Sequence, residues 1–192
     1  MAVGPNQAVL LNVRLAFNDL FTPTAFKAGQ PEMFRANVLV EPGSENDKKV
    51  QACIAHVGKE KFKDKWPKKK QLFEGDTKAF PYHDGNKKDY AGYEDMWALT
   101  AVKNSKAGKP LIVNRDKTPT ADDGTIYSGC YVNIKVEFWA QDGENSGIRC
   151  SLLSVQYWLP GDRFGGGSKP TADDLPEDEN LSEQGPDDEA LA

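Results

Sequence analysis

Apolar and polar positions alternate along much of this chain, which predicts a structure built mainly of β-strands. In residues 9–17 every odd position is apolar and is expected to face inward, while Asn12 and Arg14 fall on the opposite face. Residues 34–40 follow the same rule and place Arg35 outward. The same reasoning predicts further strands at about 96–103, 110–114, 126–139 and 148–159.

The clearest alternation spans residues 126–139, where the even positions face inward and tyrosine, lysine and tryptophan lie on the other face. A hairpin turn leads into residues 148–159, whose inward positions change phase part of the way along. Such a change indicates a β-bulge and a sharply curved sheet. Cys130 then lies opposite about residue 157 rather than Cys150, and with three cysteines in all we expect buried, reduced thiols.

One helix is predicted between the second and third strands. Ser44 with Asp47 three residues later resembles a capping box, and the helix is expected to fray around residues 58–64. Residues 65–95 show no sustained period and predict a long excursion rich in lysine and aromatic residues. The apolar stripe of the helix comprises Val50, Cys53, Ile54 and Val57.

Long, curved antiparallel strands with one amphipathic helix predict a small closed barrel, and we expect an OB-type barrel over residues 1–164. Residues 165–192 are expected to form a glycine-rich hinge and a disordered acidic tail. The first 20 residues lack the unbroken apolar core of a signal peptide, and no stretch has membrane-spanning length. We therefore expect a cytosolic protein without a membrane partner.

Charge is divided unequally between the two regions. The chain has 24 Lys and Arg against 29 Asp and Glu, and nine of the acids lie in residues 171–192, which leaves 24 against 20 in the preceding residues. A net charge of +4 therefore precedes a tail of −9. Acidic segments of this kind act as interaction tails. The candidate regulatory acids are Asp173, Asp174, Glu177, Asp178, Glu179, Glu183, Asp187, Asp188 and Glu189.

Lysines and aromatic residues are interleaved in the excursion, and residues 59–70 alone hold seven lysines against two acids. Binding of single-stranded nucleic acid without sequence readout requires cations near the phosphates and flat side chains on which bases stack. The outer strand faces add a second candidate surface. The candidate nucleic-acid-binding residues are Arg14, Arg35, Lys65, Trp66, Lys68, Lys69, Lys70, Lys78, Phe80, Tyr82, Lys87, Lys88, Tyr90, Tyr93, Tyr127, Tyr131, Lys135 and Trp139.

A structural interpretation competes with the functional one at these positions. The lysine run suits a solvated helix end equally well, and an excursion folded over the barrel would bury some of the aromatic rings. Tyr82, Tyr90 and Tyr93 lie in polar loop sequence and favour function. Phe73 and Trp97 lie beside apolar neighbours and favour the core.

Metal and catalytic chemistry find little support. Cys53 and His56 lie one helical turn apart, but no second pair completes the four convergent ligands of a structural zinc site. Residues 84–86 suit a turn better than a calcium loop. The chain has two histidines, no phosphate-binding glycine loop and no nucleophile elbow. We expect no metal, no cofactor and no enzymatic activity.

Four segments follow one another in an order that resembles a known family: residues 90–93, 127–131, 147–150 with Val155-Gln156, and 162–166. They are similar to the tailed-phage single-stranded DNA-binding proteins, formerly a domain of unknown function, of the kind found in an Enterobacter phage. The likeness covers roughly residues 5–167. It implies an OB fold that coats single-stranded DNA during phage replication or recombination, in the cytoplasm of the infected bacterium. Relatives often end in acids followed by an aromatic residue, whereas this chain ends in Ala190-Leu191-Ala192.

We expect the acidic tail and DNA to compete for one groove, with the displaced tail contacting phage or host replication proteins. Two rival functions remain. The first is a non-enzymatic adaptor that works through its acidic tail, and the second, less favoured, is a metal-dependent phage nuclease with acids distant in sequence. The sequence does not specify an oligomeric state.

Overall fold

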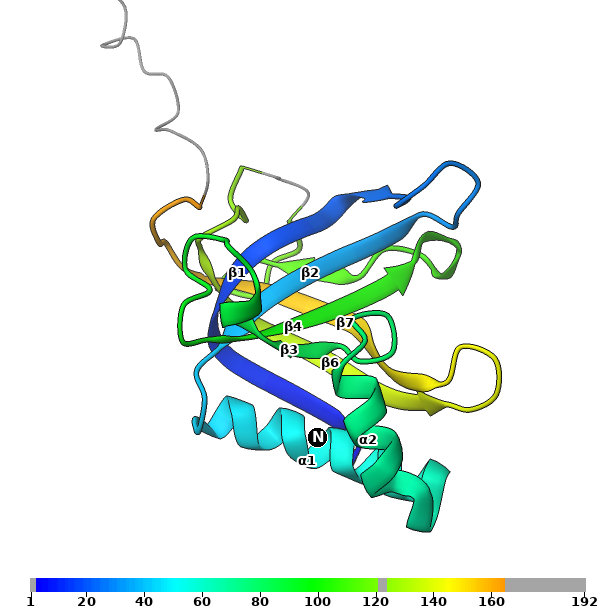
Figure 1. Ribbon diagram of the computed structural model, residues 1–192. Coiled ribbons are helices and arrows are strands. Elements are labelled where there is room, and N and C mark those ends of the chain that lie inside the picture. Colours follow the sequence, from blue (N-terminus) through cyan, green and yellow to red (C-terminus); the bar gives the residue numbers. More distant parts are fainter. Residues whose placement is uncertain (1–2, 121–123, 165–192) are drawn as a thin grey trace, which may run out of the picture.

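A closed barrel of five strands is the centre of the computed structural model, which describes residues 3–120 and 124–164 (Figure 1). Within the barrel every pair of neighbours is antiparallel except β4 and β7, which run parallel and close the ring. This arrangement confirms the predicted OB-type fold. In order around the barrel the strands are β1 (Gln7–Thr24), β2 (Met33–Val40), β4 (Trp97–Asn104), β7 (Gly147–Leu159) and β6 (Tyr131–Gln141).

Two short strands extend the sheet beyond the barrel. β3 (Tyr82–Asp84) pairs with β4, and β5 (Leu111–Val113) runs parallel to the second half of β7. The hairpin that joins β1 to β2 projects from the barrel (Figure 1). β2 and β4 are the second and third barrel strands along the chain. The hairpin therefore flanks their outer face.

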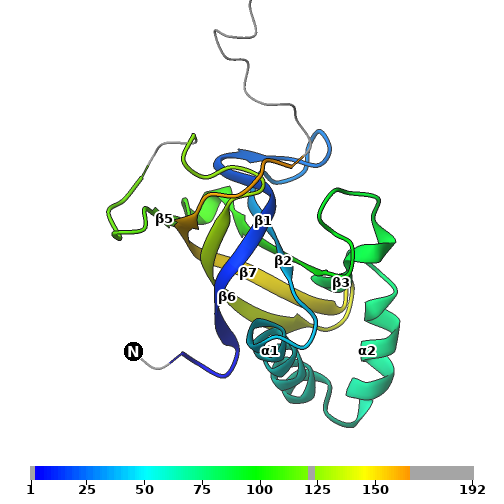
Figure 2. The same cartoon turned by 90° about the vertical axis from the view of Figure 1, so that its left-hand side faces the viewer.

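Helix α1 (Glu45–Phe62) lies across one end of the barrel and packs against β1 and β6 (Figure 2). Its predicted start is confirmed, because Ser44 is the N-cap and its side chain accepts a hydrogen bond from the Asp47 backbone. The predicted fraying is wrong. The helix continues to Phe62 because Gly58 leaves room for the Trp66 ring, which packs directly over it.

The excursion also contains regular structure, contrary to the prediction. A single 3₁₀ turn over residues 63–65 leads into a second helix, α2 (Trp66–Glu74). Pro67 is tolerated because it lies in the first turn of α2, where its missing N–H has no helical partner to lose. None of the helices in residues 3–120 and 124–164 is long and apolar enough to cross a bilayer.

The inward phase predicted for β1 is wrong at three positions. Val9 is half-buried, whereas Leu11 and Phe17 are exposed. The buried side chains of this part of β1 are Ala8, Leu10, Val13, Leu15 and Ala16.

Two irregularities of β1 cause these changes of phase. The pairing of β1 with β2 shifts register between Leu15 and Phe17, which turns Phe17 outward. A β-bulge near Asn12 accounts for Val9 and Leu11. The pairing of β1 with β6 shifts register between Leu10 and Val13, and Asn12 has a positive φ of 52°. The side chain of Asn46 bonds both the N–H and the carbonyl of Leu11, at 3.0 and 2.8 Å. The Asn133 side chain accepts from the Asn12 N–H at 2.8 Å. Side chains thus satisfy the backbone groups that a regular ladder would have paired.

The hairpin of β6 and β7 follows its sequence over most of its length. The predicted start at residue 126 is wrong, because β6 begins at Tyr131. Alternation within β6 is confirmed, and a register shift between Lys135 and Val136 confirms the predicted bulge. Cys150 lies opposite Phe138 rather than Cys130. All three cysteines are buried free thiols.

Candidate nucleic-acid interface

The outer face of β1, β2 and β4 carries rows of side chains that cross the three strands. One row consists of Phe17, Asn37 and Thr100, and the next consists of Asp19, Arg35 and Val102. Rows on one face lie two residues apart, which is about 6.6–6.8 Å along a strand. The corresponding face is the one across which OB barrels bind oligonucleotides.

Three aromatic rings gather at the first of these rows. The centroid of Phe17 lies 5.2 Å from that of Tyr90, in an edge contact, and 6.2 Å from that of Tyr93. Tyr93 is buried against Ala16 and Leu39, and burial raises its pKa to about 12. Phe17 and Tyr90 remain 45% and 49% exposed. Tyr93 therefore fixes residues 85–96 on the barrel, and the other two rings offer surfaces to a ligand.

An unpaired polar atom and two exposed lysines accompany these rings. The Asn37 side-chain oxygen, in the same row as Phe17, is buried and has no hydrogen-bond partner among the described residues. Unpaired acceptors of this kind are rare and call for an explanation. Lys87 and Lys88 are exposed in the loop that carries Tyr90, so cations and half-exposed rings occur together here.

Phe17 was not among the predicted interface residues, because the alternation in residues 9–17 placed it in the core. Phe26, in the hairpin between β1 and β2, was missed as well and is 81% exposed. Its ring lies over the Arg35 guanidinium, with 4.2 Å between the guanidinium carbon and the ring centroid. The signal that could have found Phe26 was an aromatic residue embedded in polar loop sequence, the same criterion that selected Tyr90.

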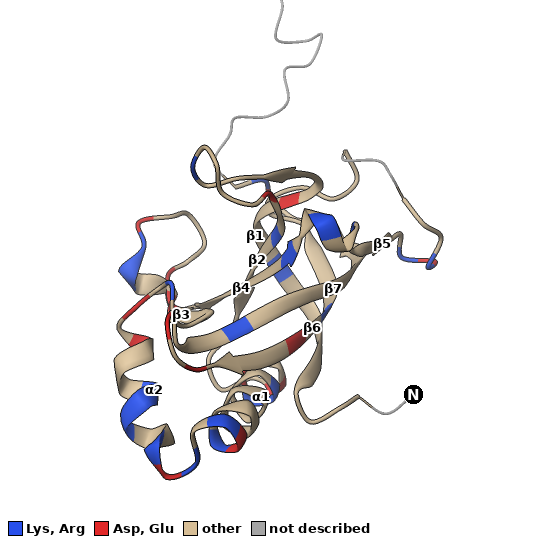
Figure 3. Ribbon diagram, turned by 90° about the vertical axis from the view of Figure 1, so that its right-hand side faces the viewer, with Lys and Arg blue, Asp and Glu red and all other residues tan. Residues whose placement is uncertain are grey.

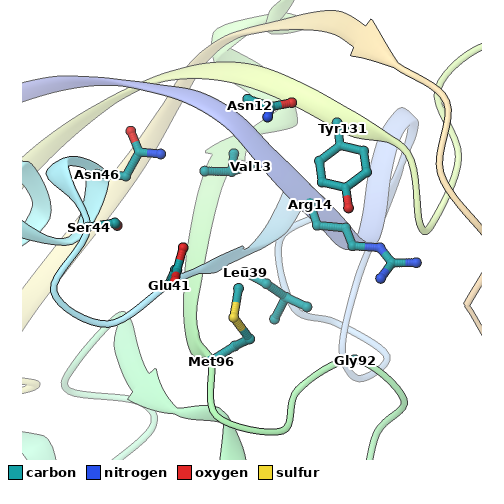
Figure 4. Close-up of a pocket in the computed structure, with 10 residues that line it drawn as sticks. All are labelled: Asn12, Val13, Arg14, Leu39, Glu41, Ser44, Asn46, Gly92, Met96 and Tyr131. Atoms are coloured by element: carbon teal, nitrogen blue, oxygen red, sulfur yellow. The ribbon is translucent and has the colours of Figure 1, made fainter.

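Arg14 lies beside a shallow pocket of about 370 Å³ on the outer face of β1 (Figure 4). Its guanidinium donates to the backbone carbonyls of Gly129 and Asp162 and stacks at 4.1 Å on the Phe164 ring. The same ring contacts Gly92, where a Cβ would overlap it. Arg14 therefore fastens the end of the described chain to the barrel.

Four of the predicted stacking residues are buried, namely Tyr93, described above, and Trp66, Phe80 and Tyr82, so the expectation that they lie at the surface is wrong. Trp66 stacks against Phe62 under α1, with 6.1 Å between ring centroids. Phe80 and Tyr82 belong to the same core, and the Tyr82 hydroxyl donates to the buried Asp47 carboxylate at 2.9 Å. These rings are therefore core residues, as the structural interpretation proposed. Their neighbours in the sequence are polar, but residues distant along the chain pack around them.

The lysines of the excursion divide into engaged and open side chains. Lys69 pairs with Asp142 at 2.8 Å and lies over the Phe62 ring, and Lys70 pairs with Glu74 at 3.4 Å. Lys65, in the 3₁₀ turn, and Lys68, in α2, are exposed. Figure 3 shows lysines and arginines gathered on α1 and α2, at the barrel end that α1 closes. Lys78 is exposed in the connection that follows α2. The helical lysines thus form a group separate from the Phe17 row.

The remaining candidates lie on β6 and on the connection before it. Lys135 and Trp139 face outward on β6, and the Trp139 Nε1–H donates to Ser151 at 3.1 Å. Tyr127 donates to the Gly161 carbonyl at 3.0 Å. The Arg163 guanidinium lies over the Tyr127 ring, with 4.0 Å between the guanidinium carbon and the ring centroid. The Arg14 guanidinium carbon lies 5.8 Å from the centroid of the Tyr131 ring.

Apart from the buried rings, the candidate residues therefore fall into three groups. These are the outer face of β1, β2 and β4 with its loops, the lysines of the helical segment and of the connection after it, and the outer side of β6 with the connection before it. The acidic residues from Asp173 to Glu189 lie outside the described residues. In the part of the chain that the structure describes, no group of three or more His, Cys, Asp and Glu side chains is placed to hold a metal ion.

Comparison with known proteins identifies relatives over most of the chain. The family described as Enterobacter phage Enc34, ssDNA-binding protein, matches residues 6–185. Protein p50 of Acyrthosiphon pisum secondary endosymbiont phage 1 is 37% identical over 179 residues, which cover 91% of this chain and 95% of that protein.

Solved structures show a similar fold. The single-stranded DNA-binding protein from bacteriophage Enc34 in complex with ssDNA has a TM-score of 0.69 at 20% identity, covering 83% of this chain and 90% of that one. The gp2.5 single-stranded DNA-binding protein of bacteriophage T7 has a TM-score of 0.54 at 12% identity, covering 92% and 98%. At such identities the likeness supports the OB-type barrel.

Proposed function

This chain belongs to the Enc34 family of phage single-stranded DNA-binding proteins, and from that premise we propose that it binds single-stranded DNA without reading its sequence. It acts during phage replication or recombination, in the cytoplasm of the infected cell, and it is not an enzyme. We assign the interface to the outer face of β1, β2 and β4.

The observation that carries this assignment is the aromatic cluster of Phe17, Tyr90 and Tyr93. Two of its rings are half exposed, and the third fixes them to the barrel. Exposed, immobilised rings are the surfaces on which bases stack, at about 1–3 kcal/mol per base. Lys87 and Lys88 lie in the same loop and supply charge for the phosphates.

Regulation by the acidic tail is the second part of the proposal. Phe164, the last described residue before the tail, packs on Gly92 and Arg14 at the edge of the proposed interface. The sequence that follows Phe164 is Gly165-Gly166-Gly167-Ser168. A tail tethered over so short a distance would have an effective concentration of about millimolar. DNA phosphates compete with its nine acids, and the displaced tail contacts replication partners.

Removal of residues 171–192 should tighten binding to a short oligonucleotide at low salt, and the difference should shrink as salt increases. Fluorescence anisotropy of a labelled oligo-dT measures this change. A full-length variant whose nine tail acids are replaced by Asn and Gln is the matched control, and it should behave like the truncation. Unchanged or weaker binding by both variants contradicts tail competition.

The same titration, repeated with duplex DNA and RNA of equal length, tests the DNA-binding function. The proposal predicts salt-sensitive binding that is tightest for the single strand. An adaptor would leave the anisotropy unchanged at every salt concentration. A nuclease would shorten the labelled strand when magnesium is added.

A further inference from the structure

Arg35, on the outer face of β2, is held by several protein atoms. Its guanidinium donates to the Asp19 carboxylate at 3.1 Å, to the Thr24 hydroxyl at 2.7 Å and to the Thr24 carbonyl at 3.2 Å. The Thr24 hydroxyl in turn donates to Asp19 at 2.7 Å. The Arg35 side chain is only 14% exposed. Its charge is neutralised and its donors are directed at protein atoms, so it is poorly placed to contact a phosphate.

What this network supports is the Phe26 ring. The ring centroid lies 4.2 Å from the Arg35 guanidinium carbon, so one ring face rests on the cation. At 81% exposure almost all the rest of the side chain faces solvent. An aromatic ring left this open gains little from burial, and folding alone does not explain why a network of three polar residues holds it in place.

The position of Phe26 matches a binding role. Arg35 lies one row along the strands from the row that contains Phe17. The Phe26 platform therefore continues the line of rings from Tyr90 and Phe17 toward the hairpin between β1 and β2. In OB barrels the loop between the first two strands flanks the oligonucleotide-binding face.

We propose that Phe26 is a base-stacking residue at the hairpin end of the interface, and that Arg35 is a positioning residue that holds its ring. This inference rests on the proposed function and specifies part of its site. A flat ring backed by a cation offers its free face to any unpaired base, because every base has a π-face. Bases inside a duplex are already stacked on both sides, so this site selects single strands.

Four variants separate stacking from other roles: Phe26→Ala, Phe26→Leu, Arg35→Gln and the double variant Phe26→Ala/Arg35→Gln. Affinity for a labelled oligo-dT is measured by anisotropy over a range of salt concentrations, and thermal unfolding confirms that each variant is folded. Leu72→Ala is the matched control, because it removes an exposed apolar side chain from α2, away from the proposed face.

Phe26→Ala should weaken binding by roughly 5- to 150-fold, the range expected for loss of one stacked base. Phe26→Leu should weaken it nearly as much, since leucine keeps apolar bulk but has no π-face. Leu72→Ala should bind like the wild type. Arg35→Gln should weaken binding without changing the salt slope, and it should add little to Phe26→Ala because both changes remove the same platform.

Three results would overturn the inference while leaving the proposed function intact. The first is wild-type affinity for Phe26→Ala. The second is wild-type affinity for Phe26→Leu, which would mean that bulk rather than stacking matters. The third is a salt slope that falls by about 0.7 in Arg35→Gln, the value for one lost phosphate contact on a single strand. Absence of binding by the wild type would instead overturn the proposed function.

Discussion

Replacing Tyr82 with phenylalanine should destabilise the protein without changing its affinity for DNA. Tyr82 is 3% exposed, and its hydroxyl donates to the Asp47 carboxylate at 2.9 Å. Asp47 also accepts from the Gly43 backbone and the Gln51 side chain, each at 2.8 Å. The variant removes one of these donors and leaves the ring, which stacks on Trp97 with centroids 5.1 Å apart.

The magnitude follows from the charge of the acceptor. A buried hydrogen bond to a charged group contributes about 1.5–3 kcal/mol to the free energy of unfolding. In a domain of this size, about 2–4 °C of Tm is lost per kcal/mol, so the midpoint should fall by roughly 3–12 °C. Urea unfolding should show a lower midpoint with an unchanged m-value. Tyr90→Phe, at a half-exposed ring, is the control and should unfold like the wild type.

The effect should also depend on pH. Burial raises the pKa of Asp47, but the hydrogen bonds from Gln51, Gly43 and Tyr82 outweigh it and lower the pKa overall. A lowered folded-state pKa gives stability that is present above the unfolded value and is lost as pH falls through the folded one. The stability gap between wild type and Tyr82→Phe should therefore narrow in acid. Equal stability at neutral pH with weaker DNA binding would refute this reasoning and place Tyr82 in the interface.

Three further outcomes follow from the structure. Phe17→Ala should weaken oligo-dT binding by about 1–3 kcal/mol in an anisotropy titration, and unchanged affinity would remove this ring from the interface. Gly129→Ala should lower the free energy of unfolding by more than about 1 kcal/mol, because Gly129 has a φ of 108° and a Cβ would overlap the Asp162 carbonyl; wild-type urea unfolding would contradict this. Hydrogen bonds, first from the Lys69 ammonium, lower the pKa of Asp142 to about 2. The stability that this pair contributes should disappear as pH falls toward that value, so wild type and Asp142→Asn should converge in acid thermal unfolding; a constant gap would argue against the pair.

The sequence predicted the inward and outward positions of β6 and β7 well, but not those of β1. In β6 and β7 the ladder partners are backbone groups of the neighbouring strands, so alternation and the change of phase appear directly in the sequence. In β1 the bulge depends on Asn46 and Asn133, which lie far away along the chain and satisfy the backbone at Leu11 and Asn12. A periodicity argument has no access to such contacts. It placed Phe17 in the core because it also missed a second irregularity, the register shift of β1 against β2 between Leu15 and Phe17.

The interface shows the same limit. Interleaved lysine and aromatic residues correctly singled out Tyr90 as a surface ring, but the same pattern covered Tyr82, which is buried because Asp47 and Trp97 pack on it. Arg35 was identified as a cation, yet its neutralisation by Asp19 depends on strand pairing. The sequence therefore predicted which kinds of side chain, cations and aromatic rings, the interface would use. Tertiary contacts decide which of these side chains are exposed to a ligand.

The central claim is that single-stranded DNA binds across the outer face of β1, β2 and β4. Amide chemical-shift mapping of the ¹⁵N-labelled full-length chain, titrated with oligo-dT, tests it most directly. The largest shifts should fall in residues 17–19, 26–37, 87–93 and 100–104. Shifts confined to the lysines of α1 and α2, or to the outer side of β6, would contradict it.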